Sequence, residues 1–132
     1  MSDTTKFIVL ADDDEDDREF FRYALESTSS AHRFLAFKDG ESLLDYLNNT
    51  ENEVPNLIFL DINMPKINGW ECLKQIRTKY SSVQLPVLIY STSNHPDDVS
   101  MSLRLGANMH IHKPNDLLLL KKLVINALSG IQ

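Results

Sequence analysis

The chain has 132 residues, of which 42% are hydrophobic and 24% are charged. This length fits one domain that buries a core without disulfides or structural metals. The 13 basic and 19 acidic residues give a net charge of −6. That balance argues against a nucleic-acid-binding protein, because such proteins gain affinity from basic residues on phosphates.

The first apolar segment is too short to direct the chain to or across a membrane. It covers only Phe7–Ala11 and is followed by acids, whereas a signal peptide needs about 7–15 apolar residues and a membrane span about 18 or more. Cys72 is the single cysteine, so no internal disulfide is possible. We therefore expect a soluble cytoplasmic protein.

Five short apolar segments predict the strands of the fold. Three are continuous runs, which is typical of strands buried on both faces of a parallel sheet. They are Phe7–Ala11, Leu57–Leu60 and Val87–Tyr90. Met109–His112 is a fourth apolar run, and Arg33–Phe37 is a weaker candidate.

Stretches with apolar residues at helical spacing alternate with these strands. They cover residues 16–27, 41–48, 70–79, 96–105 and 115–128, and Asn68 is a candidate N-cap for the third. Strands that alternate with helices predict βαβ units with helices on both faces of a sheet. We therefore expect an α/β fold forming one domain over residues 1–132, with no output domain.

Polar residues directly follow the predicted strands, where ligands bind in open α/β sheets. These residues are Asp12 and Asp13, then Asp61, then Ser91 and Thr92, and finally Lys113 and Pro114. The long separations along the chain fit intervening βα units, so we expect these side chains to converge on one edge of the sheet.

Three carboxylates that lie together repel one another unless a cation offsets their charge. Mg²⁺ suits such a cluster, since it takes one or two carboxylates, keeps several waters and bridges to phosphate oxygens. Asp12, Asp13 and Asp61 are balanced by one Mg²⁺ and Lys113 to a formal charge of zero. A neutral site of this kind favours phosphoryl transfer, which depends on positioning and charge neutralisation.

Four motifs stand in order along the chain: Ile8–Asp14, Leu60–Pro65 with Asn68-Gly69, Pro86–Ser91, and His112–Pro114. Together they resemble the receiver domain of bacterial two-component response regulators over nearly the whole sequence. The resemblance implies a flavodoxin-like (βα)5 fold with a doubly wound parallel sheet of strand order 2-1-3-4-5. It also implies a stand-alone receiver in phosphorelay signalling.

The same resemblance implies a role for each carboxylate of the cluster. Asp61 would be the phosphoacceptor and form an aspartyl phosphate, as carboxylate nucleophiles do elsewhere. Asp13 and Asp61 would bind Mg²⁺ directly, Asp12 would act through water, and the backbone carbonyl of Asn63 would be a further ligand. The protein would catalyse only its own phosphorylation and dephosphorylation, and would not otherwise be an enzyme.

Lys113 and Ser91 would contact the phosphoryl oxygens, and Pro114 would follow a cis peptide bond. The chain departs from the family at two positions. His110 replaces the Tyr or Phe that usually acts as a rotameric switch, and Thr92 replaces a smaller residue beside the phosphoryl pocket.

The resemblance also predicts the partners. A histidine kinase or histidine phosphotransfer protein would donate the phosphoryl group, and a downstream protein target would read the result. Phosphorylation would bias the surface formed by the fourth helix, fifth strand and fifth helix, and a homodimer could form through that face. No nucleic-acid or membrane partner is expected.

The same residues allow several other interpretations. The acids of Asp14–Asp17 are interpreted as a solvated first helical turn. An EF-hand loop fails because Asp17 and Tyr23 stand where it needs Gly and Glu. A haloacid-dehalogenase-type phosphatase is disfavoured because Asp16 stands where that family has Thr or Val. A flavodoxin-like cofactor protein is disfavoured by the acidic first loop, and an interaction module that is never phosphorylated is the remaining alternative.

Three further features are interpreted as structural. His110 and His112 share one strand face but lack a third soft ligand, so packing is favoured over metal binding. Cys72 lies among apolar neighbours and is predicted to be buried. The run Leu117–Leu120 has more leucines than one helix stripe buries, so part of it could face a partner.

Overall fold

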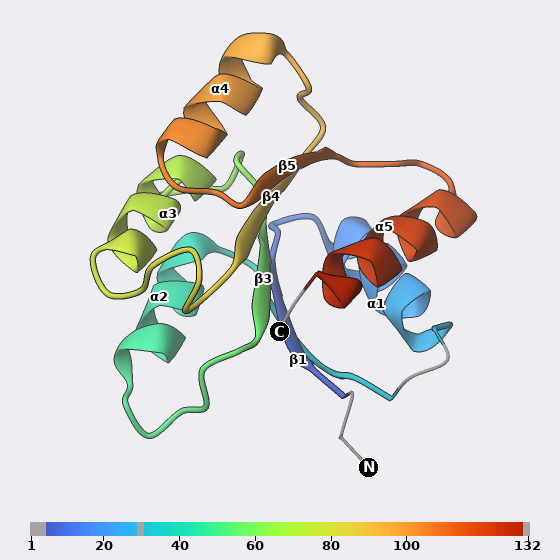
Figure 1. The fold of residues 1–132 in the computed structure, drawn as a ribbon, viewed down its shortest axis with the longest axis horizontal. Coiled ribbons are helices and arrows are strands. Elements are labelled where there is room, and N and C mark those ends of the chain that lie inside the picture. The colour runs from blue at the N-terminus through green and yellow to red at the C-terminus, as the bar shows by residue number, and fades with distance from the viewer. Residues whose placement is uncertain (1–4, 29–30, 131–132) are drawn as a thin grey trace.

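The computed structural model describes residues 5–28 and 31–130, in which five strands alternate with five helices (Figure 1). The strands are β1 (Phe7–Ala11), β2 (Arg33–Phe37), β3 (Leu57–Leu60), β4 (Val87–Ser91) and β5 (Met109–His112). The helices are α1 (Glu15–Glu26), α2 (Gly40–Asn48), α3 (Gly69–Arg77), α4 (Pro96–Arg104) and α5 (Leu117–Ser129). The predicted α/β alternation is confirmed.

Helix ends differ from the predictions by at most two residues, and side-chain caps explain where the helices start. The Asn68 side chain accepts a hydrogen bond from the Glu71 amide, which confirms the predicted cap of α3. The Asp116 side chain accepts from the amides of Leu118 and Leu119, so α5 begins at Leu117 rather than at residue 115.

All strand pairs of the sheet are parallel, and the strand order is β2-β1-β3-β4-β5. This confirms the predicted flavodoxin-like topology. The register places Ala11 of β1 opposite Leu60 of β3, and Ser91 of β4 opposite His112 of β5. Residues that follow these strands therefore leave the sheet at the same edge.

Two cores flank the sheet, because successive side chains of a strand point to opposite faces. In β1, Phe7, Val9 and Ala11 pack on the side of α2 and α3. Ile8 and Leu10 pack on the opposite side, with residues of α1 and α5 (Figure 1). Both faces are covered, which is why the central strands are continuously apolar.

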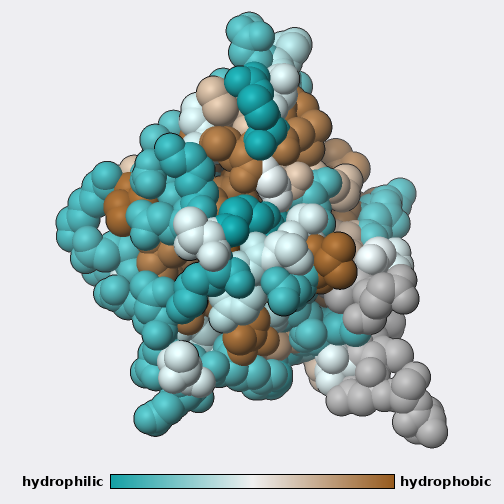
Figure 2. Space-filling view, turned by 60° about the vertical axis from the view of Figure 1, so that its left-hand side comes forward, coloured by the Kyte–Doolittle hydropathy of each residue, from teal (hydrophilic) through white to brown (hydrophobic). Residues whose placement is uncertain are grey.

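The surface is mixed in character. Hydrophilic residues predominate on the face in Figure 2, while hydrophobic residues gather near its top, at the height that α4 has in Figure 1. Among residues 5–28 and 31–130, no helix combines the length and apolar character needed to span a bilayer.

The expectation of a cis peptide bond before Pro114 is wrong. The described part of the chain contains no cis peptide bond. The trans form is the ordinary one for X–Pro bonds. With this trans bond the Lys113 side chain still reaches the carboxylates described below.

Candidate functional site

Three carboxylates meet at the edge where β1 and β3 end. Asp12 and Asp13 follow β1, and Asp61 follows β3. The Asp61 amide donates to the carbonyl of Ala11 at 3.0 Å, which ties the two strand ends together. One oxygen from each of the three carboxylates lies within 4.8 Å of the others. The predicted convergence of these acids is confirmed.

Lys113 brings the positive charge from β5 into this cluster. Its Nζ lies 2.8 Å from Asp12 Oδ2, 2.8 Å from Asp17 Oδ2 and 3.3 Å from Asp61 Oδ2. The Lys113 amide also donates to the carbonyl of Ser91 at 2.7 Å, which fixes the start of the following loop. The side chain is only 8% exposed, so water screens these contacts weakly.

Burial sets the electrostatics of the cluster. Burial raises the pKa of Asp61 to about 6, with Lys113 opposing the effect and Asp12 adding to it. Burial also raises the pKa of Asp12. Burial alone would lower the pKa of Lys113, but hydrogen bonds and charges from its carboxylate partners outweigh burial and raise it. The folded protein therefore carries crowded anionic oxygens that a further cation would stabilise.

One oxygen of this cluster lacks a hydrogen-bond donor. The Asp14 amide donates to Asp12 Oδ1 at 3.0 Å. Asp12 Oδ2 is buried and, within the described residues, no donor is aligned with it, although it pairs with Lys113 by charge. Asp13 is exposed at the mouth of the cluster. A carboxylate oxygen without a hydrogen-bond donor, next to an exposed carboxylate, suits the binding of a hard divalent cation.

Ser91 lies at the same edge, but its hydroxyl faces the loop after β4. Ser91 is fully buried, and its Oγ accepts a hydrogen bond from the Ser93 amide at 3.1 Å. Asn63 and Thr92 are exposed in the loops after β3 and β4. The structure thus places all the residues predicted for the site at one edge of the sheet, while their roles toward metal and phosphoryl group stay predictions.

Gly69, the first residue of α3, supports the Asp61 backbone. A Cβ at this position would lie 2.1 Å from the Asp61 carbonyl oxygen and 2.9 Å from Ile62 Cα. The Gly69 amide donates to the Ile62 carbonyl at 2.8 Å. A glycine is therefore required for α3 to lie directly against the loop that carries Asp61.

Asp17 is a site residue that sequence reasoning missed. The acids of residues 14–17 were expected to form a solvated helical turn, and Asp14 does cap α1 by accepting from the Asp17 amide. The Asp17 carboxylate, however, accepts a hydrogen bond from Lys113 at 2.8 Å. The only signal in the sequence was its place in the first turn, since helical side chains lean toward the helix N-terminus.

His110 makes a hydrogen bond through each of its ring nitrogens. Its Nε2 lies 2.7 Å from the Ser93 carbonyl, which can only accept, so Nε2 carries the proton. Its Nδ1 lies 2.9 Å from Ser102 Oγ. His112 is exposed, and Cys72 is buried with its pKa raised by burial to about 12, as its interpretation as a structural residue requires.

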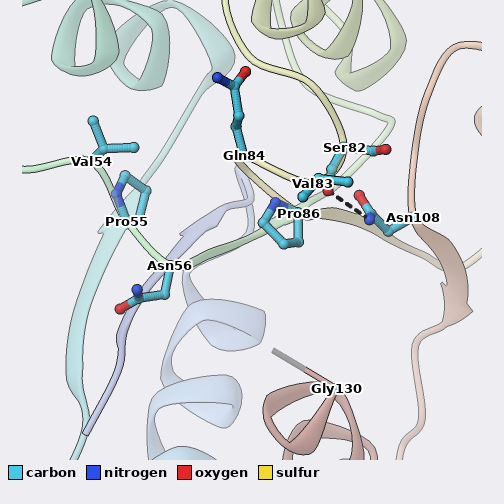
Figure 3. Close-up of a pocket in the computed structure, with 9 residues that line it drawn as sticks. All are labelled: Val54, Pro55, Asn56, Ser82, Val83, Gln84, Pro86, Asn108 and Gly130. Carbon is cyan, nitrogen blue, oxygen red and sulfur yellow. Dashed lines mark hydrogen bonds between the residues drawn. The ribbon is translucent and has the colours of Figure 1, made fainter. Parts of the chain in front are cut away.

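A cavity of about 490 Å³ lies at the other end of the sheet (Figure 3). Asn56, Pro86 and Asn108 line it, just before β3, β4 and β5. None of the residues that line it is charged, and the side-chain Nδ2 of Asn108 donates a hydrogen bond to the Ser82 carbonyl. This cavity therefore has no part in the carboxylate cluster.

Comparison with known proteins identifies the family. A sequence model described as the response regulator receiver domain matches residues 8–125. The chain belongs to this family. Receiver domains bind a divalent metal at an acidic site and interact with kinases and downstream targets, and their relatives are signalling proteins.

Individual receivers are similar over nearly the whole chain. Response regulator Rcp1 of Synechocystis sp. is 32% identical over 127 residues, which are 93% of this chain and 86% of Rcp1. The solved Mn²⁺-bound form of Rcp1 has a TM-score of 0.81 and 30% identity, covering 95% of this chain and 93% of its own. The phosphorylated cyanobacterial phytochrome response regulator RcpA has a TM-score of 0.82 and 31% identity, covering 93% and 91%. Two other curated relatives are longer proteins than this chain, and the segment that matches it spans 42% of the length of each.

The raised pKa of Asp61 makes the metal-free receiver less stable as pH rises through about 6. Above that pH the buried carboxylate is ionised in the folded state, at a cost on the order of 1–3 kcal/mol. Below about pH 4 it is protonated in both states. Asp61→Asn should therefore raise the free energy of unfolding near neutral pH and change it little near pH 4.

Urea denaturation with EDTA at the two pH values measures this difference. If Asp61→Asn instead lowered the free energy of unfolding near neutral pH, ionisation of the buried carboxylate would not destabilise the folded protein, which contradicts the prediction.

Gly69→Ala should lower the free energy of unfolding by about 1–3 kcal/mol, because the new Cβ meets backbone atoms that cannot turn aside. Gly130→Ala is the matched control, since its Cβ would meet the Ala127 carbonyl oxygen at an ordinary 3.6 Å. Urea denaturation compares the two variants. Equal effects would contradict the close approach of α3 to Asp61.

Proposed function

We propose that Asp61 accepts a phosphoryl group from a histidine kinase or a histidine phosphotransfer protein. The observation that carries the proposal is the contact of Asp61 with both Lys113 and the metal-type carboxylate cluster. A carboxylate oxygen of Asp61 attacks phosphorus, the bond from phosphorus to the donor nitrogen breaks, and its electron pair stays on the histidine. The product is an aspartyl phosphate, which the protein itself later hydrolyses.

Mg²⁺ is the proposed cofactor, and it would neutralise charge on the phosphoryl oxygens when bound. Asp13 and Asp61 would hold it directly, with Asp12 through water. The buried Oδ2 of Asp12, which lacks a hydrogen-bond donor among the described residues, supports this assignment. The backbone carbonyl of Asn63 would complete the protein ligands.

Lys113 and Ser91 would stabilise the transferred group. The ammonium of Lys113 already lies 3.3 Å from Asp61 Oδ2, so it is within reach of an oxygen added there. The Ser91 hydroxyl, which now accepts from the Ser93 amide, would donate its own proton to a phosphoryl oxygen and draw the loop after β4 toward the site. A phosphoryl group adds about −1.5 to −2 of charge, which supplies the pull.

The face made by α4, β5 and α5 would read the change. Several of its apolar side chains are exposed to about half of their area or more: Leu103, Met109, Leu118 and Leu119. A downstream protein target, or a second copy of the chain, would bind there. We further propose that this receiver acts in the cytoplasm.

Asp61→Asn should abolish incorporation of base-labile phosphate from a labelled phosphohistidine donor with Mg²⁺, because the amide cannot form the acyl phosphate. Asp14→Asn is the matched control and should label like wild type, since Asn also caps a helix. Labelling of Asp61→Asn at the wild-type level would contradict the assignment, and an unlabelled wild type would favour an interaction module.

A further inference from the structure

The Lys113 ammonium group is surrounded by carboxylates before any phosphoryl group arrives. It donates hydrogen bonds to Asp17 and Asp61, and Asp12 Oδ2 pairs with it by charge at 2.8 Å. Its Nζ lies over the Tyr90 ring, 5.4 Å from the ring centre, and the side chain is nearly enclosed. A phosphoryl oxygen can therefore bind Lys113 only if one present partner gives way.

The three carboxylates differ in their freedom to leave. The Asp12 side chain is fully buried and the Asp61 side chain is 7% exposed, and both are fixed where β1 and β3 end. The Asp17 side chain is 36% exposed and comes from the first turn of α1. A change of rotamer would move it into water while it stays near the positive end of the α1 dipole. Asp17 is thus the partner that is cheapest to displace.

We propose that Asp17 is a displaceable counter-ion that holds Lys113 in place until phosphoryl oxygens replace it. This inference rests on the proposed function, because the replacing group is the one carried by Asp61. Asp17 acts through Lys113 and is a positioning residue. It competes with the phosphoryl group for the ammonium and, once released, adds a negative charge nearby.

Removing the Asp17 charge should therefore favour anion binding at the site. Asp17→Asn keeps the shape of the side chain but removes its negative charge. The neutral amide attracts the Lys113 ammonium less strongly, so Lys113 becomes available to the anion. Because the Asp17 partner of this ion pair is partly exposed to water, the pair has a modest strength. We expect the affinity for a phosphoryl analogue to rise about 3- to 10-fold and the aspartyl phosphate to persist correspondingly longer.

The experiment titrates the Mg²⁺-loaded full chain with beryllofluoride, a phosphoryl analogue, and follows the amide NMR signals of Ser91 and Ser93. Asp17→Asn is compared with wild type and with Asp16→Asn, an exposed acid of the same helical turn. Asp17→Glu serves as the conservative rescue. Phosphate release from labelled protein is measured in parallel.

Tighter analogue binding and slower release in Asp17→Asn alone, with Asp17→Glu close to wild type, support the proposal. Equal values in Asp17→Asn and Asp16→Asn overturn it, as does weaker binding in Asp17→Asn, which would mean that Asp17 only holds Lys113 in a useful position. If wild type takes up neither analogue nor phosphate, the proposed function fails, and this inference fails with it.

Discussion

The site depends on the balance between two charges. The carboxylates at the ends of β1 and β3 repel one another, and the Lys113 ammonium group opposes that repulsion. The parallel register fixes Asp12 beside Asp61, because Ala11 and Leu60 are paired and a hydrogen bond joins the strand ends. Lys113 offsets part of that charge from β5. The remaining negative charge favours binding of a divalent cation at this edge.

The strands and the main site could be predicted because both follow from local pattern. A strand buried on both faces must be apolar throughout, and polar residues that stop it must lie at a sheet edge. Asp17 could not be found in this way, since its contact with Lys113 depends on how α1 leans over a loop separated by most of the chain. The start of α5 at Leu117 likewise depended on a cap, and the Pro114 peptide bond was assigned the wrong isomer from family resemblance alone.

The site is also connected to the face made by α4, β5 and α5. The Ser91 hydroxyl accepts from the Ser93 amide, and the Ser93 carbonyl accepts from His110 of β5. His110 contacts Ser102 of α4, whose hydroxyl accepts from the Trp70 indole of α3. Hydrogen bonds therefore connect the loop that holds Ser91 to β5, α4 and α3. The proposed effect of phosphorylation on partner binding requires such a connection.

Paramagnetic broadening by Mn²⁺ in amide NMR spectra tests the central claim most directly, because it locates a bound divalent cation without requiring any phosphoryl donor. The account predicts that substoichiometric Mn²⁺ selectively broadens the signals of Asp12, Asp13 and Asp61, and leaves Asn56 and Asn108 at the opposite end of the sheet sharp. Broadening that is uniform, or that centres away from Asp61, would contradict it.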